Sequence, residues 1–187
     1  MDSMQDAQHD MRTAYYGGAP GIFASGTAWF IAALVAFFVS PWAGILALII
    51  GGMFIFPVSV LLCKAIGSTG KHRKGNPLAS LAISGTIWMV LSIPIAVGAA
   101  LYRPAWFFPA MLLVIGSRYM TFPTIYGTRL YWIFGGALVA ASIVLLLTAA
   151  QVFASALAGA LVEFVFGAVI FAHYRRQLRP VVDASSS

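Results

Sequence analysis

The sequence predicts an all-α integral membrane protein, with six transmembrane helices arranged as three helical hairpins and both termini in the cytoplasm. Apolar residues make up 61% of the 187 residues and charged residues only 9%, whereas a soluble domain carries roughly 25% charged residues. The apolar residues fall into six runs, and nearly all Lys and Arg lie at the same ends of these runs. A domain of this size cannot hide so much apolar surface in its own core, so lipid must be its solvent.

Each run is long enough to cross a membrane, because about 20 residues rising ~1.5 Å each span the ~30 Å hydrocarbon layer. The turns between runs are short, for example Ser40-Pro41-Trp42 and Arg103-Pro104, which makes consecutive helices antiparallel neighbours. The expected boundaries are 1–20 for a polar cytoplasmic segment, 21–176 for the membrane domain with spans at 21–40, 43–65, 78–101, 105–126, 129–149 and 152–174, and 177–187 for a flexible tail.

The basic residues set the orientation, since cytoplasmic loops carry more Lys and Arg than external loops. Ten of the 11 basic residues lie on one side of the six runs, and only Arg103 lies on the other. We therefore expect the basic side to face the cytoplasm of a bacterial inner membrane. The net charge of +6 could suggest that the protein binds nucleic acid. The basic residues lie between the apolar runs, however, which argues against such a partner.

The longest connection carries a basic loop, and it lies on the expected cytoplasmic side. A topology determinant is the favoured interpretation of this loop, and a site for anionic lipid headgroups is the alternative. The basic loop consists of Lys71, His72, Arg73 and Lys74.

Short motifs recur along the chain and suggest that the hairpins are repeats. Gly26-Thr27-Ala28-Trp29 in the first run matches Gly85-Thr86-Ile87-Trp88 in the third. Phe56-Pro57 in the second run matches Phe122-Pro123 in the fourth, whereas the third hairpin lacks the Phe-Pro pair.

Glu163 is the most informative single residue. It is the only acidic residue between Asp10 and Asp183, and it lies near the middle of the sixth run. A charge at that depth costs ~3 kcal/mol or more, so Glu163 should face the protein interior and have a partner. Small residues, which let helices approach closely, share its helix face: Ala156, Gly159, Ala160 and Gly167.

Arg118 is the expected partner of Glu163. Counted from the external ends of their runs, the two residues lie 13 and 11 positions in, a difference in depth of only ~3 Å. Ser117, Tyr119 and Thr121 complete a candidate buried polar cluster. The favoured interpretation is a structural clip that specifies helix packing. A proton or ion site is one alternative, and two separately satisfied residues are the other.

The sequence predicts no catalytic residue, no cofactor and no metal site. Ser68-Thr69-Gly70-Lys71 departs from a phosphate-binding loop, because Ala65 stands where its first glycine belongs and His72 where Ser or Thr belongs. A Ser-His-Asp arrangement is excluded within the membrane, since Glu163 is the single acid there.

Three stretches resemble an uncharacterised bacterial membrane family, domain-of-unknown-function family 7010. They are YYGGAPGIFASG at 15–26, GKHRKGNPL at 70–78 and WFFPAMLLVIGSRYMTF at 106–122, and the glutamate of the sixth run accompanies them. The resemblance covers most of the chain and implies a six-helix membrane protein without an assigned activity. A weaker similarity is to the HdeD-type acid-resistance membrane proteins, which resemble this chain at Arg118 and Glu163.

We therefore expect a non-enzymatic multipass protein of the inner membrane, of unknown biochemical activity and connected with envelope or acid stress. The alternative is a small transporter or channel with a site at Glu163 and Arg118. The lipid bilayer is the expected partner, and a homo-oligomer or another membrane protein is left open.

Overall fold

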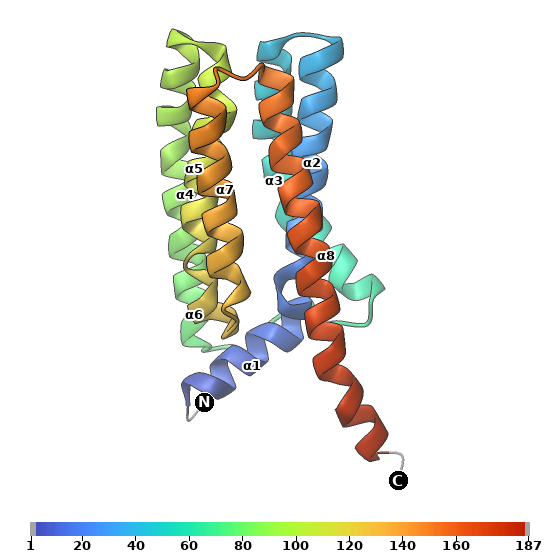
Figure 1. Ribbon diagram of the computed structural model, residues 1–187. Coiled ribbons are helices and arrows are strands. Elements are labelled where there is room, and N and C mark those ends of the chain that lie inside the picture. The colour runs from blue at the N-terminus through green and yellow to red at the C-terminus, as the bar shows by residue number, and fades with distance from the viewer. Residues whose placement is uncertain (1–2, 186–187) are drawn as a thin grey trace.

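The computed structural model describes residues 3–185, with side chains up to residue 177, and within this range the chain is helical throughout apart from its turns. The helices run upright beside one another, except for a short N-terminal helix that lies across one end (Figure 1). The α-helices are α1 (Met4–Tyr15), α2 (Ala19–Phe38), α3 (Pro41–Ala65), α4 (Pro77–Tyr102), α5 (Phe107–Tyr119), α6 (Phe122–Tyr126), α7 (Leu130–Leu147) and α8 (Val152–Ser185).

The prediction of six membrane spans is confirmed, because six helical stretches of the described chain are long and apolar enough to cross a bilayer. Side-chain caps and prolines explain where two of them begin. Ser40 Oγ accepts a hydrogen bond from the Ala43 amide at 3.1 Å, and Asn76 Oδ1 accepts one from the Leu78 amide at 3.0 Å. A proline follows each cap, where its missing N–H and fixed φ suit the first turn of a helix.

The fourth predicted span is interrupted, and the break has a local cause. It consists of a 3₁₀ turn at Pro104–Trp106, then α5, then the separate short helix α6. Pro123 lies in the first turn of α6, so it cannot donate the hydrogen bond that would continue α5. The Thr121 hydroxyl instead bonds the Arg118 carbonyl at 2.8 Å, which helps to satisfy the end of α5.

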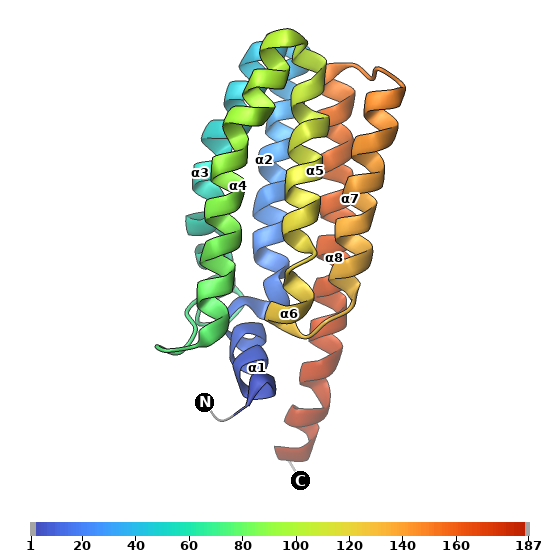
Figure 2. The same ribbon diagram turned by 90° about the vertical axis from the view of Figure 1, so that its left-hand side faces the viewer.

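The upright helices form two groups, which we call the α2 group (α2, α3 and α8) and the α5 group (α4, α5, α6 and α7) (Figures 1 and 2). Small residues mark the closest contacts. A Cβ added at Gly44 of α3 would lie 2.5 Å from Ala36 Cβ of α2, and one added at Gly159 of α8 would lie 2.5 Å from the Trp29 ring of α2. Such residues let helix backbones approach closely in a membrane.

Small residues also mark the close contact between α5 and α7. This contact bears on the last of the expected hairpins, which α7 and α8 would form. A Cβ at Gly135 of α7 would lie 2.6 Å from the carbonyl oxygen of Gly116 on α5. Because α7 packs closely on α5 and α8 packs closely on α2, these two consecutive helices contact each other far less than either contacts its main neighbour. They stand apart in Figure 1, joined by a loop at one end.

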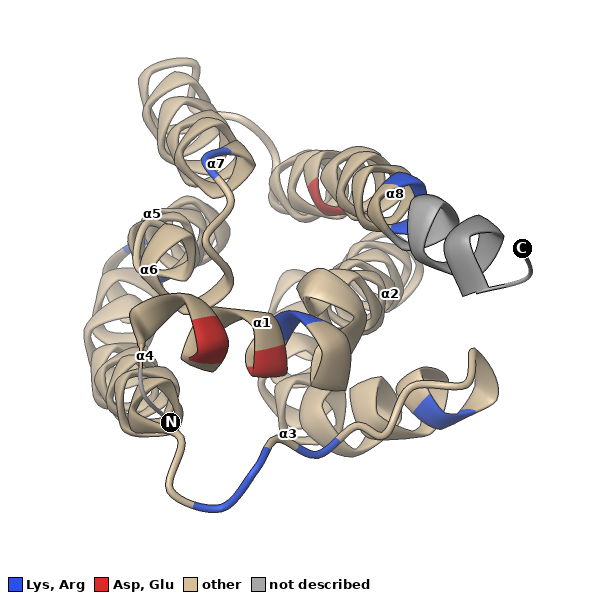
Figure 3. Ribbon diagram, turned by 90° about the horizontal axis from the view of Figure 1, so that it is seen from below, with Lys and Arg blue, Asp and Glu red and all other residues tan. Residues whose placement is uncertain are grey.

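Helix α1 lies across the end of the bundle where both termini are found (Figures 1 and 3). It buries Ala7, Met11 and Ala14 and is fixed to both sides by hydrogen bonds. The Gln8 amide donates to the Thr124 carbonyl at 2.9 Å, and the buried Asn76 amide donates to the Ala7 carbonyl at 3.0 Å. The segment expected to be a polar extension is therefore a strap that joins the α5 group to the loop between α3 and α4.

Helix α8 is longer than the predicted span at 152–174, because its backbone remains helical to Ser185. The predicted tail at 177–187 thus begins within this helix, and residues 186 and 187 lie outside the described residues.

Candidate functional site

Glu163 lies in the interior of the protein, where α2, α5 and α8 meet. Its exposed fraction is 0%, and it faces the part of α2 that contains Gly26. A Cβ added at Gly26 would lie 3.3 Å from Glu163 Cβ. Glycine at this position therefore lets α2 pack directly over the glutamate, which agrees with the small-residue face predicted for α8.

The carboxyl group of Glu163 has no hydrogen-bond partner among the described residues. Both of its oxygen atoms are buried and unpaired. The hydroxyl groups of Ser25 on α2 and Tyr119 on α5 lie beside it. Buried polar groups are normally paired, so an unpaired carboxyl group in a membrane protein marks a candidate for binding a proton or an ion.

Two further buried polar atoms without a partner lie along the same contact between α2 and α8. They are Trp29 Nε1 and Ser155 Oγ, and both residues have an exposed fraction of 0%. The Trp29 ring packs over Gly159, which lies midway between Ser155 and Glu163 on α8. Ser155, Trp29 and Glu163 thus form an inner row, about 12 Å long at ~1.5 Å per residue.

Arg118 does not contact Glu163. Its guanidinium donates to Thr86 Oγ1 on α4 at 3.0 Å, lies 3.8 Å from Met89 Sδ, and is 5.4 Å from the centre of the Phe122 ring. No ion pair joins Arg118 to Glu163 in the described part of the chain. Arg118 points from α5 toward α4, whereas Glu163 points from α8 toward α2.

Ser117 and Thr121 accompany Arg118 rather than Glu163. The Ser117 hydroxyl bonds the Val114 carbonyl at 2.8 Å, and both residues line a groove of about 330 Å³ between α4 and α5, together with Arg118. Of the predicted polar cluster, only Tyr119 lies beside Glu163. The predicted cluster is therefore two separate sites, one inside the bundle and one at its edge.

Sequence reasoning missed Ser25 as a neighbour of Glu163 and Trp29 as part of the same contact between α2 and α8. The signal was present in the recurring motif, because Gly26 is the residue that permits the close contact with α8. Ser25 precedes this glycine and Trp29 follows it by three residues, so both lie next to the point of contact.

The basic loop lies beside α1 and is partly neutralised by it. Tyr15 Oη and His72 Nδ1 are 2.8 Å apart. The Arg73 amide donates to Asp10 Oδ2 at 3.0 Å, and Asp10 Oδ2 also accepts from Asn76 Nδ2 at 2.7 Å. The side chains of Lys71 and Lys74 are exposed. These contacts give the loop a role in fixing α1, in addition to carrying charge.

A metal centre is not formed by the side chains that the structure describes, because no three of their His, Cys, Asp or Glu residues gather to hold an ion.

Comparison with known proteins identifies the family. A model of a family of unknown function, DUF7010, matches residues 4–173, which include Glu163 and all of the spans except the end of the last one. No curated protein and no solved structure matches the chain, so the weaker similarity to HdeD-type proteins has no counterpart among the matches. The chain is a multipass membrane protein that belongs to the DUF7010 family of unknown function.

Proposed function

We propose that this protein is a non-enzymatic protein of the bacterial cytoplasmic membrane in which Glu163 binds a proton and thereby controls how the two helix groups pack. The observation that carries the proposal is the complete burial of Glu163, with both carboxyl oxygens unpaired. Its position beside α2, α5 and α8 means that a change in its charge acts on the contact between the α2 group and the α5 group.

The physical argument rests on the cost of an unpaired charge. An ionised carboxylate in the middle of a membrane costs ~3 kcal/mol or more, and this cost falls when water or a counter-charge reaches it. Arg118 is bonded to Thr86 and forms no ion pair with the carboxyl group among the described residues. The packed arrangement therefore suits the neutral acid, whereas the ionised acid favours an arrangement that admits water between the groups.

The inner row supports proton entry from outside the cell. Ser155 lies three residues after the start of α8, at the end of the bundle away from the termini. Ten of the 11 basic residues lie toward the other end, which supports cytoplasmic termini by the positive-inside rule. Ser155 and Trp29 would then lie between Glu163 and the external face, as expected of a protein that responds to acid or envelope stress.

A small proton-coupled transporter is the second candidate, and the unpaired Trp29 Nε1 and Ser155 Oγ favour it. Both atoms could bind water along the inner row if α2 and α8 separated there. A transporter also requires a route from Glu163 to the cytoplasm. Proton flux in liposomes distinguishes the candidates, because only the transporter predicts a flux that Glu163→Gln abolishes.

The pH dependence of stability tests the proposal. Stability should be highest at acidic pH and fall as the pH rises, because the unfolded chain releases the Glu163 proton while the packed protein retains it. Thermal unfolding in detergent over a range of pH should show this fall in the wild type and a much flatter profile in Glu163→Gln.

Asp10→Asn is the matched control for this measurement, since it removes a carboxylate outside the membrane spans. It should keep the slope of the wild type. If Glu163→Gln kept that slope as well, Glu163 would not be the proton site.

A further inference from the structure

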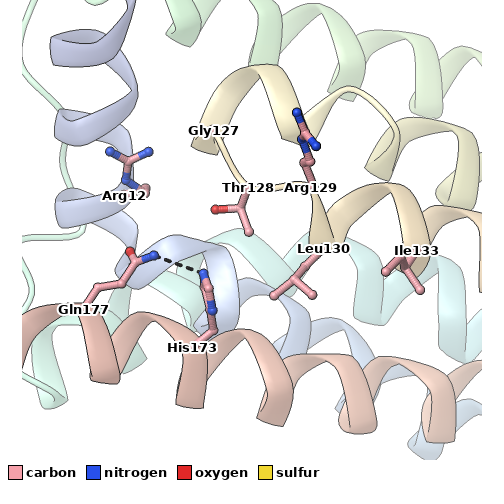
Figure 4. A pocket seen from close by; sticks show the side chains of 8 residues that line it. All are labelled: Arg12, Gly127, Thr128, Arg129, Leu130, Ile133, His173 and Gln177. Atoms are coloured by element: carbon pink, nitrogen blue, oxygen red, sulfur yellow. Dashed lines mark hydrogen bonds between the residues drawn. The ribbon is translucent and has the colours of Figure 1, made fainter.

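A second pocket lies at the end of the bundle that carries the termini, away from Glu163. It has a volume of about 400 Å³ and is bounded by α1, by the turn between α6 and α7, and by α8. Figure 4 shows Arg12 on α1, Thr128 and Arg129 on the turn before α7, and His173 and Gln177 on α8. Three separate parts of the sequence thus contribute to one site.

Basic side chains line this pocket, and no acid is among the described residues that line it. Arg12 and Arg129 line it together with His173, and none of its lining residues is Asp or Glu. Asp10, the closest acid to Arg12 in the sequence, is bonded to the Arg73 amide and to Asn76 instead. Among the described residues, neither guanidinium group is paired with an acid.

The backbone fixes Arg12 at this position. Its Nη1 donates to the Tyr126 carbonyl at 2.8 Å, and it lies against Gly127, where an added Cβ would come within 2.7 Å of Nη1. Gly127 has a φ of +64°, which glycine adopts without strain. A guanidinium held in this way has fewer rotamers to lose when it binds an anion.

The remaining side of the pocket is apolar and faces outward. Leu130 and Ile133 of α7 line it, and Ile133 has an exposed fraction of 63%. The adjacent Trp132 is 56% exposed, as is common where a helix crosses the membrane–water interface. A ligand in this pocket would meet cationic groups at one end and lipid-facing side chains at the other.

We propose that this pocket binds the phosphate of an anionic phospholipid, with the acyl chains lying along the beginning of α7. Guanidinium groups pair well with phosphate oxygens, and basic pockets between helices at the cytoplasmic face recognise anionic headgroups. A free phosphate would use Arg12 and Arg129 but would leave Leu130 and Ile133 without a role, so the lipid fits the pocket better.

Native mass spectrometry of the full-length protein in detergent tests this site. The probes are phosphatidylglycerol, phosphatidylcholine with the same acyl chains, and free glycerol phosphate as competitor. The wild type should retain phosphatidylglycerol in preference to phosphatidylcholine. Arg129→Gln should weaken phosphatidylglycerol binding about fivefold or more, as expected for the loss of one basic group near a headgroup.

Lys71→Gln is the matched control, because it removes an equal and exposed charge from the same end of the bundle. It should change binding by less than about twofold if the pocket, rather than the surface charge, recognises the lipid. Arg129 is exposed and makes no side-chain hydrogen bond to the described residues, so Arg129→Gln should keep the helical circular dichroism of the wild type.

Three results would overturn the proposal. They are equal retention of the two lipids, equal losses in Arg129→Gln and Lys71→Gln, and no loss in Arg129→Gln. Displacement of the lipid by an equal concentration of glycerol phosphate would instead identify a site for soluble phosphates and would refute the lipid assignment.

Discussion

The same five-residue pattern, Ser-Gly-Thr-x-Trp, occurs in both helix groups, at Ser25–Trp29 on α2 and at Ser84–Trp88 on α4. In each case the glycine lies against an ionisable residue of another helix. A Cβ added at Gly26 would lie 3.3 Å from Glu163 Cβ, and one added at Gly85 would lie 3.8 Å from Arg118 Cγ. One motif therefore packs against an acid and the other against a base.

The surroundings of the two motifs differ more than their sequences. Trp29 has an exposed fraction of 0%, whereas Trp88 is 49% exposed, because α2 lies between α3 and α8 while α4 is at the edge (Figure 3). Arg118 lies at this edge, where its long side chain can reach polar surroundings. Glu163 can become neutral, and it is the residue found in the interior. Its position is thus the one at which we propose that a proton binds.

The largest expected effect comes from truncating the tryptophans of the two motifs. Trp29→Ala should lower the free energy of unfolding by about 3–5 kcal/mol, because it removes a completely buried ring and leaves a cavity beside Gly159. Trp88→Ala, the matched change in the other motif, should cost less than about 1 kcal/mol. Chemical unfolding in mixed micelles measures both values, and equal losses would contradict the difference in packing between α2 and α4.

The smallest expected effect is the coupling between Arg118 and Glu163. Because the two side chains belong to different sites, the losses in Arg118→Met and Glu163→Gln should add to within about 0.5 kcal/mol in the double mutant. A paired clip would instead let the double mutant recover much of the loss. Such a recovery, measured in the same unfolding assay, would show that these two residues form a pair.

The spans could be predicted from the sequence because hydropathy and length report directly on the bilayer. The expected ends agree with the helices to within two residues, except at the C-terminal end of α8. The interruption between α5 and α6 was not predicted, although Pro123 caused it, because prolines are often accommodated within membrane helices. Pro57 and Pro94, for example, lie inside the continuous helices α3 and α4.

The site could be predicted only in part, for a geometric reason. The rise per residue gives the depth of a side chain, but the direction in which it points depends on how each helix is rotated against its neighbours. Glu163 was correctly expected to face the interior, because small residues surround it on α8. The direction of Arg118 depended on Thr86 and Met89 of α4, and no pattern within its own helix indicated that contact.

Infrared spectroscopy of the protein in lipid tests most directly whether Glu163 holds a proton. A protonated carboxyl group has a C=O stretching band that an ionised carboxylate lacks. The wild type should show this band at neutral pH, Asp10→Asn should keep it, and Glu163→Gln should lose it while remaining folded. Wild-type spectra without the band at neutral pH, or a band that persists in Glu163→Gln, would contradict the assignment of Glu163 as the proton-binding residue.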